Sequence, residues 1–293
     1  MNAQKLYAVA TEIARVNPRV SDYALAKALG LSLAEGRDLL WQLEDAGLAE
    51  PDIPDALTRR WVRAVDTTDA AAVQQCLEAG FQVNTPIISR HAEPLLPLLY
   101  ACPWCTEPQE LEILRLLLSA GADPNLCDAD GDTALMYVTH PTAVRLLLDA
   151  GADATLRNHR GQSVLHPADR FYHIESVRLL LSAGADPHAE DNEGCTPLFC
   201  QRDDLAAHPD ILSLLLQSGA DLHHTNHAGQ TVVDYAINNV NYAYAALLLR
   251  HGATPTPNTL PDFLTRELTY GEGKEEVLRA LLQQRIARKS NGE

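Results

Sequence analysis

The sequence has 293 residues, of which 46% are hydrophobic and 21% are charged, and its formal net charge is −16. This composition fits an ordered soluble protein. No apolar run reaches the roughly 20 residues of a membrane-spanning helix, and the N-terminus lacks the apolar segment of a secretion signal. Six cysteines in this length do not form a disulfide framework, so we expect a cytoplasmic protein with reduced thiols.

Residues 1–53 predict a small domain of three helices. Apolar side chains recur at helical spacing over 6–13, and a second short helix is expected over 22–29. Ser32 and Glu35 have the spacing of a capping box and open a third helix. Two helices joined by a tight glycine turn form the outline of a helix-turn-helix.

The stretch 20–51 resembles the winged-helix gamma domain of FtsK-type DNA translocases, a resemblance that implies a helix reading DNA. Such a helix presents Arg, Lys, Asn or Gln to the bases. The aligned positions here include Glu35 and Asp38, and Arg37 is the remaining basic residue. Residues 1–53 carry a net charge of −3, which opposes phosphate binding. We therefore favour a protein-binding or structural cap over a DNA reader.

The rest of the chain repeats one short phrase, Gly-Ala-Asp or a close variant. The phrase starts at residues 121, 151, 184, 219 and 252, with spacings of 30, 33, 35 and 33. A period of this length predicts stacked supersecondary units that bury their apolar faces against one another.

Each unit follows the same order of signals. In 159–191, Gly161 marks a turn, Ser163 opens a short helix expected to run to about residue 170, and a second helix follows from 174. Gly184 then ends that second helix, because glycine adopts the left-handed conformation of a helix cap.

This order of turn, Thr-Pro-Leu start, Val-x-x-Leu-Leu helix and Gly-Ala-Asp exit resembles an ankyrin-repeat array over residues 55–293. The resemblance implies an all-α solenoid that follows a winged-helix-like domain of residues 1–53. Two caps with polar outer faces, 55–84 and 258–293, are expected to close the array, and residues 260–264 and 277–282 are expected to form the two helices of the second cap. Five full repeats are expected between them, at 90–128, 129–158, 159–191, 192–226 and 227–257.

The candidate chemical motifs do not form a recognisable active site. Cys102-x-x-Cys105 lies in an insertion between two helices, without the strand of a redox motif or the second ligand pair of a zinc site. His166 matches the ankyrin histidine that forms hydrogen bonds within and between repeats. Nucleophile elbows, P-loops and Rossmann glycines are absent from the sequence. We therefore expect no catalysis, metal, cofactor or small-molecule substrate.

The favoured function is a non-catalytic module that binds a protein partner through the concave ankyrin surface. Ankyrin proteins bind such partners with their turns and the inner face of their first helices, and the resemblance transfers these roles to matching positions. The predicted partner-binding residues are Ala129, Asp130, Asp132, Tyr137, His159, Arg160, Gln162, Asn192, Glu193, Cys195, Phe199, His227, Ala228, Gln230 and Tyr235.

Two alternative functions stay open at this stage. One is a DNA-tethered adaptor or regulator that holds nucleic acid through the N-terminal domain, although the acidic helix over 33–46 opposes this. The other is an acidic inhibitor or immunity protein that covers a basic enzyme, because a net charge of −16 favours basic partners. The resemblance to FtsK-type domains suggests a bacterial source.

Overall fold

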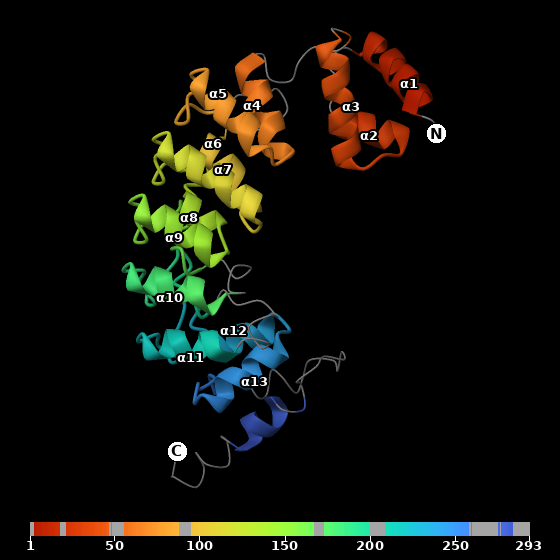
Figure 1. Ribbon diagram of the computed structural model, residues 1–293. Helices are drawn as coiled ribbons and strands as arrows, with labels where there is room; N and C mark the ends of the chain where they lie inside the picture. The colour runs from red at the N-terminus through yellow and green to blue at the C-terminus, as the bar shows by residue number, and fades with distance from the viewer. Residues whose placement is uncertain are drawn as a thin grey trace. The chain divides into compact units, whose positions relative to one another are not determined.

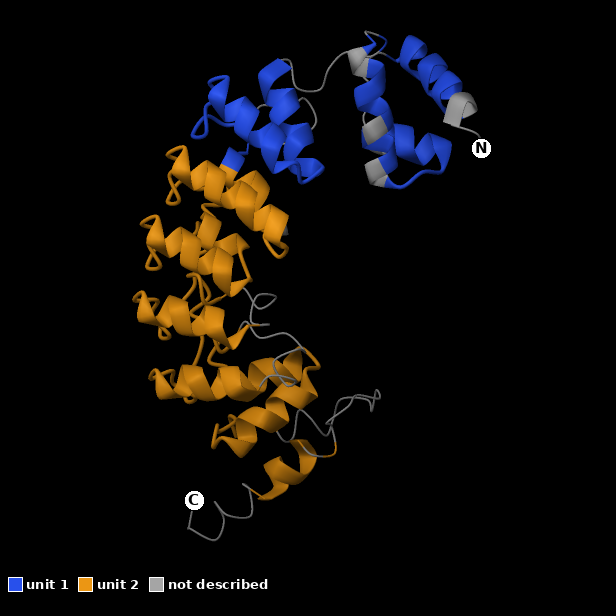
Figure 2. Ribbon diagram, viewed as in Figure 1, with its two compact units in different colours: residues 1–97 blue, residues 98–293 orange. Residues whose placement is uncertain are grey.

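The computed structural model describes residues 3–17, 22–46, 48, 56–87, 95–166, 173–199, 209–257, 259, 275 and 277–283. Within these ranges the regular structure is helical, and extended pairing is limited to isolated bridges such as Cys127 with Thr133. The expected all-α class is therefore confirmed for the described residues. The chain divides into two compact units, 1–97 and 98–293, which are described separately (Figure 2).

The two units are defined by which residues lie close together in space, whereas the boundary predicted between residues 53 and 55 is defined by where the repeat pattern begins. That boundary stays a prediction. The first unit contains the three N-terminal helices, α1 (Ala3–Val16), α2 (Asp22–Leu29) and α3 (Leu33–Asp45). It also contains the helix pair α4 (Ala56–Asp66) and α5 (Ala70–Glu78).

The three N-terminal helices begin and end where the sequence signals predict. The Ser32 N–H and hydroxyl donate to Glu35 Oε2 at 2.9 and 2.7 Å, which confirms the capping box at the start of α3. These hydrogen bonds lower the pKa of Glu35. Residues 49–55, which follow the three N-terminal helices, lie outside the described residues. The winged-helix resemblance is therefore not confirmed.

The pair α4 and α5 has an apolar interior of its own. Trp61 is fully buried and stacks on Phe81, with ring centroids 4.8 Å apart and planes 7° from parallel. At the start of α5, the Asp69 carboxylate accepts the Ala72 N–H at 3.0 Å and caps the helix.

The second unit is a series of helix pairs separated by turns. The first helices of the pairs are short, namely α6 (Pro97–Ala101), α8 (Ala134–Tyr137) and α12 (Val232–Asn238). The second helices are longer and pack side by side in chain order, as Figure 1 shows for α7 (Pro108–Ser119), α9 (Pro141–Asp149), α10 (Ile174–Ser182) and α11 (Pro209–Gln217). The last pair is closed by α13 (Tyr242–Arg250), which packs against α12. The expected first helix after Ser163 falls mostly on residues 167–172, outside the described residues.

The second helices hold the series together through their apolar faces. Each contributes side chains at helical spacing that are almost completely shielded from solvent, and burying one such Leu or Val contributes about 1.5–3 kcal/mol. The buried apolar residues of α7, α9, α10 and α11 are Ile113, Leu114, Leu117, Ala143, Val144, Leu147, Val177, Leu180, Ile211, Leu212 and Leu215.

Turns at the start of successive repeats are linked by backbone hydrogen bonds. The His159 N–H donates to the Asp130 carbonyl, and the same bond joins the next two pairs of turns, each at 2.9 Å. Gly194, with φ of 75°, lies so close to the next turn that an added Cβ would be 2.9 Å from the His227 backbone nitrogen. At Gly229 the φ is 71°, but no atom lies within 4 Å of the same position.

Buried hydroxyl side chains begin α8 and α12 and stand at the matching positions Ser163 and Thr196 of two further repeats, and the residue three positions later decides whether the hydroxyl has a partner. The Thr231 N–H and hydroxyl donate to Asp234 Oδ2 at 2.9 and 2.8 Å. In 159–191, the Ser163 hydroxyl lies 2.9 Å from His166 Nδ1.

In two repeats the buried threonine hydroxyl has no such partner in the described part of the chain. Thr133 and Thr196 are both 3% exposed, and their hydroxyl oxygens have no hydrogen-bond partner among the described residues. The residues three positions later are Met136 and Phe199, which offer no polar atom that could bond the hydroxyl strongly. Each of these hydroxyls therefore imposes a desolvation cost without a compensating bond.

The C-terminal end of the array is described in part. The Asp234 carboxylate accepts hydrogen bonds from the hydroxyls of Thr256 and Thr259, so it anchors the segment after the last Gly-Ala-Thr phrase. Val277 and Leu281 are buried, in agreement with the second helix expected in the C-terminal cap. Residues 260–264, expected to form its first helix, lie outside the described residues.

We predict that Gly194→Ala destabilises the protein more than Gly229→Ala. Both substitutions place a Cβ at positive φ, which costs about 1–2 kcal/mol. At residue 194 the Cβ also meets backbone of the next turn, and such overpacking adds about 1–3 kcal/mol. Urea unfolding followed by circular dichroism measures the difference, and equal losses for the two variants would contradict the proposed close contact.

We also predict opposite effects for two Thr→Val substitutions. Thr196→Val removes a hydroxyl without a described partner, so it should leave the free energy of unfolding unchanged or raise it by about 1 kcal/mol. Thr231→Val removes the hydroxyl that donates to Asp234, although the backbone N–H of residue 231 remains, and should lower the free energy of unfolding by about 1–3 kcal/mol. The same unfolding experiment compares them, and a larger loss for Thr196→Val would refute this account.

Candidate protein-binding surface

The turns at the start of four repeats form what we call the tip surface, residues 129–132, 159–162, 192–195 and 227–230. Each turn is shaped by an Asp or Asn side chain that lies just before it. In the third turn, Asp191 Oδ1 accepts the N–H groups of Glu193 and Cys195, both at 2.9 Å. Asp128, Asn158 and Asn226 make the equivalent pairs of bonds in the other turns.

Sequence reasoning did not single out these four anchors as functional. A signal was present, because each anchor precedes the turn glycine by three residues, as Asp128 precedes Gly131. Asn158 also reaches the preceding turn, where its Nδ2 donates to Asp132 Oδ1 at 2.8 Å. Side-chain anchors and backbone bonds together fix the row of turns before any partner binds.

Most of the predicted partner-binding residues lie on the surface. Asp132, Tyr137, Gln162, Gln230 and Tyr235 are half-buried. The exposed members are Ala129, Asp130, His159, Arg160, Asn192, Glu193, His227 and Ala228.

Cys195 and Phe199 are corrections to the predicted set, because each is only 2% exposed and cannot offer its side chain to a partner. The Cys195 sulfur accepts a hydrogen bond from Asn226 Nδ2 at 3.7 Å. Phe199 packs edge-on against the rings of His224 and Tyr235, with centroids 6.0 and 5.6 Å apart. Phe199 occupies the same place in its repeat as the buried His166, so the repeat register could have predicted its burial.

Three tyrosines share one position on α6, α8 and α12, the first helices of their pairs, which we also call the inner helices. Tyr100, Tyr137 and Tyr235 are each the fourth residue of their helix, and all three are half-buried. The Tyr137 hydroxyl donates to the Asp128 carboxylate, which connects this tyrosine to its turn. Tyr100 was missed from the sequence, because the inserted segment after residue 95 obscures the register of that repeat.

The charged groups of the tip surface are mostly directed to solvent. The nearest pair is Arg160 Nη2 with Asp132 Oδ2 at 3.9 Å, and the arginine side chain is 66% exposed. An exposed pair of this kind contributes little to stability. Asp130 and Glu193 are exposed carboxylates, so a partner could pair with them without breaking an internal contact.

The Cys102 and Cys105 pair lies between α6 and α7, as expected, but both thiols are buried. Burial raises the pKa of Cys105 to about 12, and the nearby Glu110 adds to the shift. Its Sγ donates to the Ala101 carbonyl at 3.3 Å. A protonated, shielded thiol is a poor nucleophile and a poor metal ligand. Within the described ranges, His, Cys, Asp and Glu side chains form no group of three that could hold a metal ion.

His166 is a structural residue that connects two repeats, as the sequence predicted. Its Nε2 lies 3.0 Å from the Cys195 carbonyl, and its Nδ1 lies 2.9 Å from the Ser163 backbone nitrogen. Because the carbonyl can only accept and the Ser163 N–H can only donate, the ring is neutral with its proton on Nε2. Burial lowers the pKa of His166 in the folded protein.

None of the helices in the described part of the chain combines the length and apolar character that a bilayer crossing requires.

We predict that His166 makes the protein less stable at acid pH. The folded state keeps the ring neutral, whereas the unfolded chain binds a proton near pH 6.5. The stabilisation is therefore complete above this pH and declines as pH falls below it. Between pH 7.5 and 5.5 the wild type should lose about 1 kcal/mol more than His166→Asn, measured by urea unfolding at both pH values. Equal losses in the two proteins would show that His166 takes up a proton without unfolding.

Comparisons with known proteins agree with this geometry. A search of curated proteins gives no match. The crystal structure of EF0377, an ankyrin repeat protein, is similar with a TM-score of 0.52 and 25% identity, covering 65% of this chain and 96% of that one. The ankyrin repeat domain of Bcl-3, described as a unique member of the IkappaB protein family, is similar with a TM-score of 0.50 and 27% identity, covering 67% and 86%.

A family model described as ankyrin repeats in three copies matches residues 98–191 and 173–259, which together make up more than half of the chain. The match falls on the segment where the Gly-Ala-Asp phrases, the linked turns and the stacked second helices occur. The chain therefore belongs to the ankyrin-repeat family.

Proposed function

We propose that this protein is a non-catalytic module that binds a protein partner through the tip surface and the adjoining tyrosines of the inner helices. Ankyrin-repeat proteins generally mediate protein–protein interactions, and the family is typically a non-catalytic scaffold. The single observation that supports this assignment most strongly is the row of exposed side chains on turns that are already fixed by backbone hydrogen bonds.

The fixed turns reduce the cost of binding. Association is opposed by the entropy of ordering loops and side chains at the interface. Here the backbone bonds between His159 and Asp130 and between His227 and Glu193 order the turns in the free protein. A larger part of the contact free energy is then available as affinity.

We expect a few large side chains to dominate that affinity. Binding hot spots are enriched in Tyr, Trp and Arg. Arg160 is exposed on its turn, and Tyr137 and Tyr235 present half-buried rings on the adjoining helices. A half-buried ring suits this role, because its position is held by the core while one face stays available to a partner.

The charge of the chain favours a basic partner. Its net charge is −16, and the exposed carboxylates of Asp130 and Glu193 lie on the proposed surface. Complementary charge speeds association and selects between partners. The five described cysteines are free thiols, which suits the reducing environment of the cytoplasm.

We predict that Asp130→Lys together with Glu193→Lys weakens partner binding about tenfold or more, which corresponds to about 1.4 kcal/mol. The reversal removes attraction to a basic partner and adds repulsion. The partner is first captured from an extract of the native host and identified by mass spectrometry. The purified pair is then titrated by calorimetry, and the melting temperature is recorded for each variant.

The matched control is Glu112→Lys together with Asp149→Lys. These residues are exposed on the second helices α7 and α9, away from the turns, and the change in net charge is identical. The control should bind with the wild-type affinity. Unchanged affinity in the tip variant, or equal weakening in the control, would remove the tip surface from the proposed function.

A further inference from the structure

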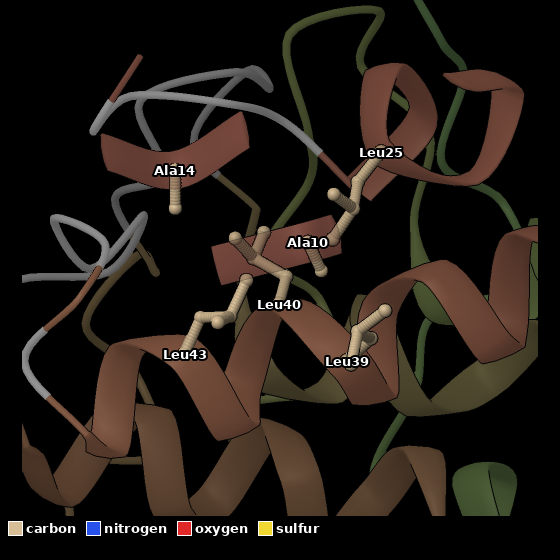
Figure 3. Close-up of a cluster of buried hydrophobic side chains, with 6 residues drawn as sticks. All are labelled: Ala10, Ala14, Leu25, Leu39, Leu40 and Leu43. Atoms are coloured by element: carbon tan, nitrogen blue, oxygen red, sulfur yellow. The ribbon is translucent and has the colours of Figure 1, made fainter. Parts of the chain in front are cut away.

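Helix α3 packs three of its leucines into the interior of the N-terminal domain and contacts α4 with other side chains. Leu39, Leu40 and Leu43 point into the buried cluster that α3 shares with α1 and α2, together with Ala10 and Leu25 (Figure 3). The buried members of this cluster come from the three N-terminal helices. Among the described side chains of α3, Arg37 and Trp41 lie outside the cluster, and Arg37 occupies a position that a helix-turn-helix protein would use for DNA.

The first of two contacts on this surface is an ion pair with the first helix of the array. Arg37 Nη1 donates to Asp66 Oδ2 at 2.9 Å, and the two side chains are 37% and 15% exposed. A charge-assisted bond of this length between partly shielded groups is stronger than an open surface pair. Arg37 is the one basic residue of α3, so α4 engages the positive charge that DNA binding would need.

The second contact joins the same two helices, but here the cation comes from α4 and its partner from α3. The Arg63 guanidinium of α4 lies over the ring of Trp41, with its central carbon 4.9 Å from the ring centroid. Arg37 and Trp41 are four residues apart on α3, and Arg63 and Asp66 are three residues apart on α4, so each pair lies on one helix face. Each helix therefore contributes one cation to the contact.

The charges of the two helices are also complementary. Apart from Arg37, the charged residues of α3 are acidic: Glu35, Asp38, Glu44 and Asp45. In contrast, α4 carries three arginines, Arg59, Arg60 and Arg63, and a single acidic residue.

We propose that α3 is an intramolecular docking surface for α4, and that this contact, rather than reading nucleic acid, is the role of the helix that resembles a DNA-recognition helix. The N-terminal domain is then a cap held on the first helix pair by contacts that include an ion pair and a cation–π contact. Each partner has its own buried interior, Leu43 and its neighbours on one side and Trp61 with Phe81 on the other. The docking is therefore reversible and weakens as salt screens the charges.

The test compares full-length variants by small-angle X-ray scattering at 50 and 500 mM salt. These concentrations lie below and above 0.1 M, where the Debye length is about 10 Å, so the charges are screened weakly in the first and strongly in the second. Arg37→Asp places two acidic groups opposite each other, so the radius of gyration should increase at low salt. Arg37→Asp combined with Asp66→Arg restores an opposite pair and should return the wild-type value. Trp41→Ala should give an intermediate increase, because it removes only the second contact.

The control is Arg15→Asp, which makes the same change in charge on α1, where Arg15 is exposed and pairs within its own helix with Glu12. It should scatter as the wild type does. Circular dichroism verifies that each variant keeps its helix content. An unchanged radius for Arg37→Asp, or no recovery in the double variant, would overturn the proposal.

A second measurement separates docking from DNA reading. The full-length wild type is titrated with a fluorescein-labelled DNA duplex at 50 mM salt, and the proposal expects no change in anisotropy. Binding that is lost in Arg37→Ala and unaffected by Asp66→Asn would show that α3 reads DNA, and the docking role would be wrong.

Discussion

The array depends on the burial of each helix pair against its neighbours. A pair such as α8 and α9 is too small to shield its own leucines, and Leu147 becomes fully buried because the adjoining second helices cover it. The hydrogen bonds between turns follow from this packing, since it holds consecutive repeats at the spacing that a backbone bond requires. Cohesion in this protein is therefore a property of neighbouring repeats rather than of any single repeat.

This constraint divides the residues of a repeat between two tasks. Positions that face a neighbour must be apolar or must complete a hydrogen bond, as Leu180 and His166 do. Positions on the outer side of a turn, such as Asp130, carry no comparable requirement. The N-terminal domain shows the same division, because its leucines form its own interior while Arg37 and Trp41 contact a different helix.

Sequence patterns predicted the features that depend on local order. The repeat period and the capping box at Ser32 could be read from spacing, since each arises from local order, and the resemblance to ankyrin repeats implied the structural role of His166. The burial of Phe199 also follows from the repeat register, because Phe199 matches the position of His166. The contact of Arg37 with Asp66 could not be read in this way, because it depends on which distant segment lies opposite the side chain, and a period or a propensity carries no such information.

The turns are shaped by main-chain bonds, by four inward-facing Asp and Asn anchors and by the Asn192 amide, which donates to the His159 carbonyl at 3.0 Å. Residues 129, 130, 159, 160, 193, 227 and 228 carry no comparable side-chain bond to a described residue of a neighbouring turn, so we expect that they can be exchanged while the scaffold stays intact. In evolutionary terms, point substitutions at these seven sites would change what the surface presents to other molecules, without first requiring stabilising changes elsewhere.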